Sequence, residues 1–87
     1  MLRLMIVDDE QIIREALSSM IDYTSLGYEV IATAKNGMEA YDRIRDDYPD
    51  VVITDIKMPI LNGLELIERA SRIDSRITFI LLFGYGE

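Results

Sequence analysis

Apolar and polar positions follow two different rhythms along the chain. Four short runs are almost continuously apolar and mostly rich in branched aliphatic residues, at 2–7, 28–34, 51–54 and 77–83. Runs of this kind are typical of strands in a parallel sheet whose two faces are both covered. Between them, apolar residues recur about every 3.6 positions, which predicts amphipathic helices. The alternation predicts one α/β domain, a doubly wound parallel sheet with right-handed crossovers and helices on both faces.

Three helices are predicted between the strands. The first follows Glu10, and its apolar stripe consists of Ile12, Ile13, Ala16, Leu17, Met20 and Ile21. The second opens at Asn36-Gly37 and closes at Tyr48-Pro49, and its inward positions are Met38, Tyr41 and Ile44. The third opens at Asn62-Gly63, and its inward positions are Leu64, Ile67, Ala70 or Ser71, and Ile73. Its solvated face consists of Glu65, Glu68, Arg69 and Arg72.

The composition limits the chemistry that the chain can perform. Eighty-seven residues with an apolar fraction of 49% suit one small globular domain. There is no cysteine and no histidine. Disulfides, thiolate or zinc-type metal sites and histidine-dependent catalysis are therefore excluded. Any bound metal must sit on oxygen ligands, which favours a hard cation such as Mg²⁺ or Ca²⁺.

Charge and hydropathy also limit the partners. The net charge of −7 disfavours direct contact with nucleic acid or an anionic membrane. No apolar run approaches the roughly 20 residues that span a bilayer. The start of the chain, MLRLMIVDDE, turns acidic at once and does not have the form of a signal peptide. A cytoplasmic location is expected.

Carboxylates follow two of the predicted strands directly. Asp8 and Asp9 come after the first strand, and Asp55 comes after the third. Ligands of such sheets bind at the carboxyl ends of the strands. If the two strands are neighbours, three like charges meet at one edge, and a divalent cation would relieve their repulsion. Mg²⁺ is the expected ion, beside a carboxylate that can act as a nucleophile.

A plainer interpretation of these residues stays open. An Asp after a strand often caps the next helix, and Asp9 stands in the right place to do so. Asp8 would then belong to a solvated loop, and Asp55 alone is equally ambiguous. The compatible spacing of the pair and Asp55 strengthens the prediction of a site.

Three sequence blocks carry a family resemblance. They are IVDDE at 6–10, NGMEA at 36–40 and VVITDIKMPILNGLEL at 51–66. With these blocks, the chain resembles the receiver domain of bacterial two-component response regulators. Receivers attached to AraC-type DNA-binding output domains are the most similar. The resemblance implies a flavodoxin-like or CheY-like fold whose four strands have the order 2-1-3-4.

The resemblance also implies roles for particular residues. Asp55 would accept a phosphoryl group from a sensor histidine kinase. Mg²⁺ would be held by Asp9 directly, by Asp8 through water, by Asp55 and by the backbone carbonyl of Lys57. The Lys57 side chain would be a solvated loop lysine. Phosphoryl transfer of this kind depends on charge neutralisation and in-line positioning, and the histidine belongs to the donor.

Two features depart from the family. The tip of the fourth strand, where the family has Ser or Thr, carries Phe83, which has no hydroxyl to bond a phosphoryl group. The family's last helix, strand and helix are missing, together with a site lysine. Residues 1–87 are therefore expected to be an incomplete receiver, and Gly84-Tyr85-Gly86-Glu87 to begin a connection to the missing parts. The chain would be a piece of a longer protein, or a second copy would pair with the exposed edge of the fourth strand.

Three functions follow from these features. The first is a phosphoacceptor signalling domain that controls an output domain outside this chain, with transcription as the expected output. It is no enzyme beyond self-phosphorylation and self-dephosphorylation. The second, favoured by Phe83, is a degenerate receiver that acts as a phosphorylation-independent protein-interaction module. The third, a Mg²⁺-dependent phosphotransfer enzyme acting on small substrates, is disfavoured because Lys57 stands where it would need a second carboxylate.

Overall fold

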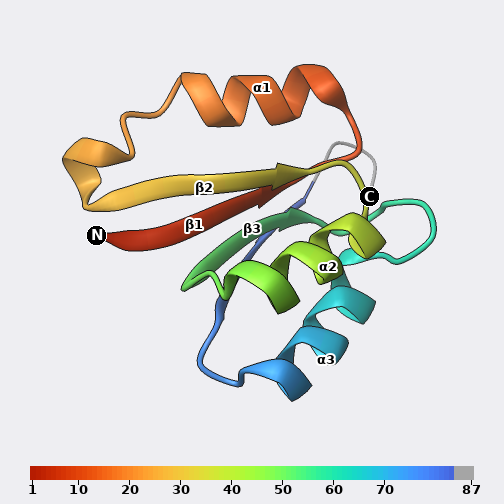
Figure 1. Cartoon of the computed structure of the whole chain (residues 1–87). Helices are drawn as coiled ribbons and strands as arrows, with labels where there is room; N and C mark the ends of the chain where they lie inside the picture. The colour runs from red at the N-terminus through yellow and green to blue at the C-terminus, as the bar shows by residue number, and fades with distance from the viewer. Residues whose placement is uncertain (84–87) are drawn as a thin grey trace.

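A computed structural model describes residues 1–83 of the chain (Figure 1). Its elements are β1 (Leu2–Val7), α1 (Gln11–Ser19), the 3-10 helix η1 (Thr24–Leu26), β2 (Tyr28–Ala34), α2 (Gly37–Asp47), β3 (Val51–Asp55), α3 (Gly63–Ile73) and β4 (Thr78–Leu82). The predicted strands agree with these bounds within one residue at either end. The predicted connection at Gly84-Tyr85-Gly86-Glu87 lies outside the described residues.

The four strands form one parallel sheet in the order β2-β1-β3-β4. Figure 1 shows α1 on one face of the sheet and α2 and α3 on the other. Both the doubly wound architecture and the strand order are therefore confirmed. In this order β1 and β3 are the two inner strands and are neighbours, so their carboxyl ends lie side by side.

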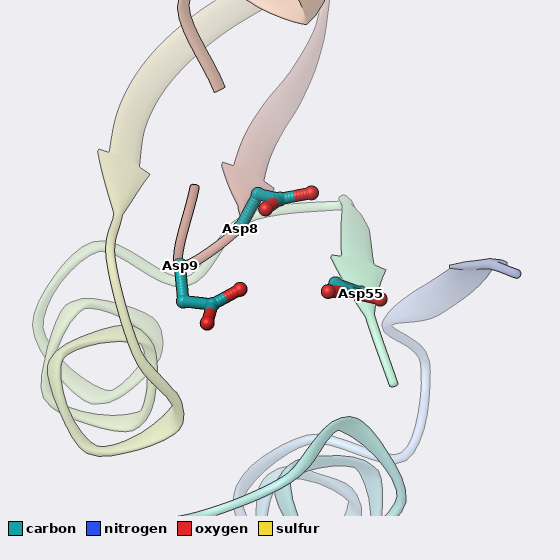
Figure 2. A group of neighbouring side chains, drawn as sticks. All are labelled: Asp8, Asp9 and Asp55. Carbon is teal, nitrogen blue, oxygen red and sulfur yellow. The ribbon is translucent and has the colours of Figure 1, made fainter. Parts of the chain in front are cut away.

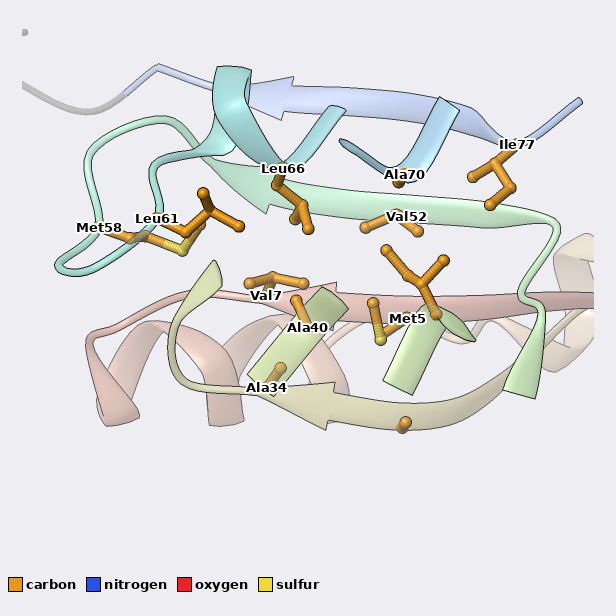
Figure 3. Close-up of a cluster of buried hydrophobic side chains, with 12 residues drawn as sticks. Met5, Val7, Ala34, Ala40, Val52, Met58, Leu61, Leu66, Ala70 and Ile77 are labelled. Carbon is orange, nitrogen blue, oxygen red and sulfur yellow. The ribbon is translucent and has the colours of Figure 1, made fainter. Parts of the chain in front are cut away.

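The larger core lies between the sheet and the helices α2 and α3 (Figure 3). Met5, Val7 and Val52 project from the two inner strands into this core, and all three are fully buried. The helices contribute Ala40 and Leu66, also fully buried. Burial on this face fixes the register of β1 against β3, because a shift of one residue would turn these side chains to the other face.

Helix α2 is confirmed and α3 is corrected. In α2, Ile44 is buried, and Met38 and Tyr41 are half-buried against the core. In α3, Leu64 was predicted to point inward but is 57% exposed, whereas Leu66 is fully buried. The reason is that Gly63, the first residue of α3, packs against β3.

The rest of α3 follows from this start. Residues three and seven positions after Gly63 share its face of the helix. Leu66 and Ala70 are therefore the buried positions, and Ser71 is exposed. Ile67 and Ile73 are half-buried.

Helix α1 buries far less than its apolar stripe predicts. Ile12 is 81% exposed and Met20 equally so, while Ala16 and Leu17 are only half-buried. Within residues 1–83, no second long helix lies beside α1 on this face of the sheet (Figure 1). The stripe therefore has only the sheet to pack against, and a small cluster around Leu4, Ile6, Tyr23 and Val51 forms the core there.

The end of the sheet beyond β3 is thinly covered. β4 pairs with β3, and its outer edge pairs with no other strand among residues 1–83. Ile80 is exposed, and Phe79 and Leu82 are half-buried, as expected for a poorly covered strand. Ile80 also lines an apolar groove of about 220 Å³ on the α1 side, together with Ile21 and Leu26.

The short helix η1 was not predicted from the apolar pattern. The Asp22 side chain accepts hydrogen bonds from the amide and the hydroxyl of Ser25 and so starts the turn. Gly27 ends it with a left-handed φ of 88°. A side chain at that φ would be strained, although nothing lies within 4 Å of the place a Cβ would take. Polar local bonding forms this element, and a hydropathy pattern does not record it.

Candidate functional site

The carboxyl ends of β1 and β3 bring three aspartates together. Val7 pairs with Thr54 in the parallel register, so the residues that follow them, Asp8 and Asp55, lie at the same edge of the sheet. Oxygen atoms from Asp8, Asp9 and Asp55 all lie within 4.8 Å of one another. Figure 2 shows Asp8 and Asp9 at the end of β1, across a short space from Asp55 at the end of β3. The predicted convergence of these three side chains is confirmed.

The three carboxylates differ in their exposure. Asp8 is 4% exposed and Asp55 is 9% exposed, whereas Asp9 is open to solvent. Two negative groups are therefore held in partly desolvated surroundings, and the third closes the cluster on its solvent side. The three carboxylates repel one another unless a cation binds between them, because like charges that are close together and partly buried interact strongly.

Asp8 is bound on its inner side by the chain that follows it. Its Oδ1 accepts a hydrogen bond of 2.9 Å from the backbone N–H of Glu10. Burial, followed by the charges of Asp9 and Glu10, raises the pKa of the Asp8 carboxyl above its ordinary value. The Glu10 amide and the Arg14 guanidinium act in the opposite direction and do not offset it.

The plainer alternative, in which Asp9 caps the first helix, is wrong. Helix α1 has Glu10 as its N-cap residue, and no side chain bonds there as a cap. The Glu10 amide is used by Asp8 instead. Since Asp9 does not cap the helix, its exposed carboxylate belongs to the acidic cluster.

Arg14 is a site neighbour that the sequence did not reveal. One of its guanidinium nitrogens donates a hydrogen bond of 2.8 Å to the backbone carbonyl of Asp8. This bond ties the second turn of α1 to the end of β1. Its only sequence signal is its position four residues after Glu10, on the same side of the helix as the start of the turn.

Asp55 is held by its own backbone and its neighbours. Its Oδ1 accepts 2.8 Å from the N–H of Ile56. Its backbone carbonyl accepts 2.9 Å from the hydroxyl of buried Thr54. The carbonyl of Ile56 accepts 2.8 Å from the N–H of Gly63, the first residue of α3. The carboxylate thus has a fixed orientation at the edge of the sheet.

The loop between β3 and α3 forms the outer wall of the site. Lys57, Pro59 and Asn62 line an open hollow of about 410 Å³ together with Met58 and Asp9. The Lys57 side chain is exposed, as predicted, and ligation by its backbone carbonyl stays a prediction. Ile60 has a left-handed φ of 73°, which is a genuine outlier for a β-branched residue. The loop is therefore strained at its exposed tip.

Phe83 lies next to this edge but outside the acidic cluster. Asp55 pairs with Leu82 in the β3–β4 register, and Phe83 is the next residue of the chain. Its side chain is 77% exposed. An apolar ring at this place has no hydroxyl to donate to a ligand on Asp55.

The donor set fits a hard divalent cation. Mg²⁺ prefers carboxylate and carbonyl oxygens. In proteins it is usually bound by one or two carboxylates and keeps several water molecules as its other ligands. The cluster offers three carboxylates, one of them facing solvent, and no nitrogen or sulfur ligand. The carboxyl edge of this doubly wound sheet is therefore a candidate site for a hard divalent cation.

Comparison with known proteins defines the class. The response regulator receiver domain model matches residues 4–87, and the chain belongs to that family. Receivers are signalling domains of two-component systems rather than enzymes with small-molecule substrates. No helix among the described residues is long and apolar enough to cross a membrane.

The curated relatives include transcriptional regulators. An uncharacterized transcriptional regulatory protein YesN of Bacillus subtilis is 44% identical over all 87 residues, which cover 24% of that protein. The transcriptional regulatory protein HptR of Staphylococcus aureus is 39% identical over 87 residues, and these cover 34% of its length. The chain thus spans a quarter to a third of the curated relatives that it matches.

Solved receivers have the same fold. The receiver domain of AraT, a response regulator from Geobacillus stearothermophilus, has a TM-score of 0.92 and 36% identity over 97% of this chain and 65% of its own. A chain of the CheX–CheY–BeF3–Mg²⁺ complex from Borrelia burgdorferi has a TM-score of 0.86 and 28% identity, over 99% of this chain and 64% of its own. The resemblance found in the sequence is therefore confirmed at the level of family and fold.

Proposed function

We propose that this domain is a phosphoacceptor whose Asp55 takes a phosphoryl group from the phosphohistidine of a sensor kinase. The observation that carries the proposal is the convergence of Asp8, Asp9 and Asp55 at one edge of the sheet. The family supports it, since receivers act in two-component signalling. In the transfer, the phosphorus–nitrogen bond of the donor breaks, and a phosphorus–oxygen bond to the Asp55 carboxylate forms.

The residues of the site have separate tasks in this proposal. Asp9, Asp55 and the Lys57 carbonyl would hold Mg²⁺, and Asp8 would assist them through water. When bound, the ion neutralises the carboxylates and the phosphoryl oxygens. The Ile56 amide donates to Oδ1 of Asp55 and so helps to fix the orientation of the carboxylate that would attack the phosphorus. Positioning and electrostatic stabilisation together supply most of the catalysis in phosphoryl transfer.

The output of the signal is proposed from the relatives. YesN and HptR are named as transcriptional regulatory proteins, and both are much longer than this chain. We infer a DNA-binding output domain outside residues 1–87 and a cytoplasmic location, with the acidic domain itself making no contact with DNA. Residues 1–87 would then be the incomplete receiver part of that protein.

The experiment is phosphorylation of the 87-residue chain by acetyl phosphate in the presence of Mg²⁺. A base-labile adduct is expected on the wild type and not on Asp55→Asn. Asp46→Asn is the matched control, because it makes the same change on the exposed face of α2 and should be labelled like the wild type. An adduct that persists in Asp55→Asn would refute the proposal.

A second candidate function is favoured by Phe83. With an exposed ring at the place of the hydroxyl, the domain would bind a protein partner without phosphoryl control. This candidate predicts Mg²⁺ binding without labelling in the same experiment. Labelling that depends on Asp55 would exclude it.

A homo-oligomer through β4 is the alternative to a longer chain whose other residues cover this strand edge. The strand TFILL carries no charged residue, and its outer edge is unpaired among residues 1–83. Such an edge is a template for pairing with another chain. Light scattering of the 87-residue chain should show a dimer that Ile80→Lys converts to a monomer. A wild-type monomer would contradict this alternative alone.

A further inference from the structure

Two glycines begin the helices next to the candidate site. Gly37 opens α2 and Gly63 opens α3, each directly after an Asn whose side chain caps the helix. Among the described glycines, only Gly27 has a positive φ. The backbone at Gly37 and Gly63 is therefore open to any residue, and what distinguishes both positions is the space around them.

At Gly63, a side chain would collide with the peptide of Asp55. A Cβ there would lie well under 3.0 Å from the carbonyl oxygen of Asp55, and 3.1 Å from the Cα of Ile56. Both are backbone atoms, so neither can rotate aside as the end of a side chain could. Room for a methyl group can come only from moving α3 or the chain at Asp55 and Ile56.

That part of the chain is what holds the Asp55 carboxylate. The Ile56 carbonyl accepts from the N–H of Gly63, and the Ile56 N–H donates to Oδ1 of Asp55, each at 2.8 Å. A displacement of this peptide shifts the amide on which the carboxylate rests. It also changes the distance between Asp55 and the carboxylates of Asp8 and Asp9.

Gly37 makes the corresponding contact with the other end of the same loop. A Cβ on Gly37 would lie 2.7 Å from the Cβ and 2.8 Å from the carbonyl carbon of Leu61, and closer still to its carbonyl oxygen. Leu61 is buried and closes the loop that starts after Asp55. The first residues of α2 and α3 therefore contact the two ends of this loop, and Lys57 lies between the two contacts.

We propose that Gly63 is a positioning residue for Asp55, and Gly37 for the loop that carries Lys57. Because neither residue has a side chain, the first turn of each helix can pack directly against the backbone: α3 against Asp55 and Ile56, and α2 against Leu61. This inference rests on the proposed function, because it assumes that the cluster binds Mg²⁺. Residues that support ligands from behind typically change metal affinity by about 10- to 100-fold when altered.

The test is a Mg²⁺ titration of the 87-residue chain followed by the backbone amide signals in ¹H–¹⁵N spectra. Gly63→Ala and Gly37→Ala are compared with the wild type and with Gly27→Ala. Gly27 lies before β2, at the opposite end of the sheet, and an added Cβ there meets nothing within 4 Å. That variant is strained by its φ of 88° and loses stability without touching the site.

The expected result separates positioning from loss of stability. Gly63→Ala should weaken Mg²⁺ binding by about tenfold or more, and the Ile56 amide signal should already move in the metal-free spectrum. Gly37→Ala should weaken binding as well, with shifts centred on Lys57. Gly27→Ala should bind Mg²⁺ like the wild type even though it unfolds at lower temperature. A variant that loses its fold in buffer is measured in trimethylamine N-oxide, which favours the compact state.

Three outcomes would overturn the positioning roles or the proposed function. If the wild type binds Mg²⁺ and both alanine variants bind it within about twofold of the same affinity, the positioning roles are wrong. If the wild type shows no Mg²⁺-dependent shift at Asp8, Asp9 or Asp55, the proposed function itself fails. An equal loss of affinity in Gly27→Ala would also defeat the positioning roles, because it would show that affinity follows stability alone.

Discussion

Replacing Asp8 by asparagine should make the metal-free protein more stable. The carboxylate oxygens of Asp8, Asp9 and Asp55 lie within 4.8 Å of one another. At an effective dielectric constant of about 20, two charges at that spacing repel by about 3 kcal/mol. Solvent around the exposed Asp9 reduces this, so that about 1–2 kcal/mol is expected from removing one charge. Asparagine keeps an oxygen that can accept from the Glu10 amide.

The assay is thermal unfolding followed by circular dichroism, first in excess chelator. For a domain of this size, 1 kcal/mol corresponds to roughly 4–8 °C in Tm. Asp8→Asn should therefore unfold about 5–15 °C above the wild type. Asp46→Asn serves as the control, since it removes a charge from the exposed face of α2 and should leave Tm nearly unchanged.

Excess Mg²⁺ should reduce or reverse the difference in Tm between Asp8→Asn and the wild type. An ion that binds only the folded state stabilises it according to its concentration relative to Kd. The wild type should gain more from excess Mg²⁺ than Asp8→Asn does, because the variant has lost a charge at the site. An Asp8→Asn variant no more stable than the wild type in chelator would refute the reasoning about repulsion.

The pH dependence gives the same prediction a second check. The pKa of Asp8 is raised in the folded protein, so the folded state binds a proton more tightly than the unfolded chain does. At neutral pH the charged Asp8 lowers the free energy of unfolding of the wild type. As the pH falls through the raised pKa, Asp8 is protonated and this loss of stability decreases, and below the ordinary pKa of Asp it is gone. The Tm gap between Asp8→Asn and the wild type in chelator should therefore shrink as the pH falls. A gap that widens would contradict the shift.

Three further substitutions test other parts of the structure. Ile60→Gly should raise stability by about 1 kcal/mol by relieving a β-branched residue at φ 73°, whereas Ile60→Ala, still strained, should gain little; equal Tm values for both variants would count against strain at this position. Leu66→Ala should cost about 2–5 kcal/mol in urea unfolding, and Leu64→Ala under about 1 kcal/mol, because Leu66 alone is fully buried; similar costs would restore the inward position of Leu64. Phe83→Ser should leave Mg²⁺ affinity unchanged but lengthen the lifetime of the Asp55 adduct by supplying a hydroxyl donor; an unchanged lifetime would show that this position does not contact the phosphoryl group.

Sequence patterns were sufficient to predict the four strands and the three long helices because these patterns are local and repeated. Each strand is a short apolar run. Asn-Gly pairs mark the starts of α2 and α3, and in both helices the Asn side chain is the N-cap. The position of the acidic residues after the first and third apolar runs placed them at strand ends. Their convergence, however, depended on β1 and β3 being neighbours, which is a matter of tertiary order and was expected from the family resemblance.

What the sequence did not predict depends on tertiary contacts. The stripe of α1 has correct periodicity, yet Ile12 is exposed because periodicity does not say what covers a face. Leu64 and Leu66 are chemically identical, and only the seating of Gly63 on β3 decides which is buried. The left-handed Ile60 and the use of the Glu10 amide by Asp8 likewise have no apolar signal.

The central claim is that Asp55, and no other carboxylate of the cluster, is the phosphoacceptor. Borohydride reduces an aspartyl phosphate to homoserine, which marks the modified residue permanently. The 87-residue chain is treated with acetyl phosphate and Mg²⁺, reduced, digested and sequenced by tandem mass spectrometry. Homoserine at position 55 alone is the predicted result. Homoserine at position 8 or 9 in a folded, Mg²⁺-binding chain would contradict the account.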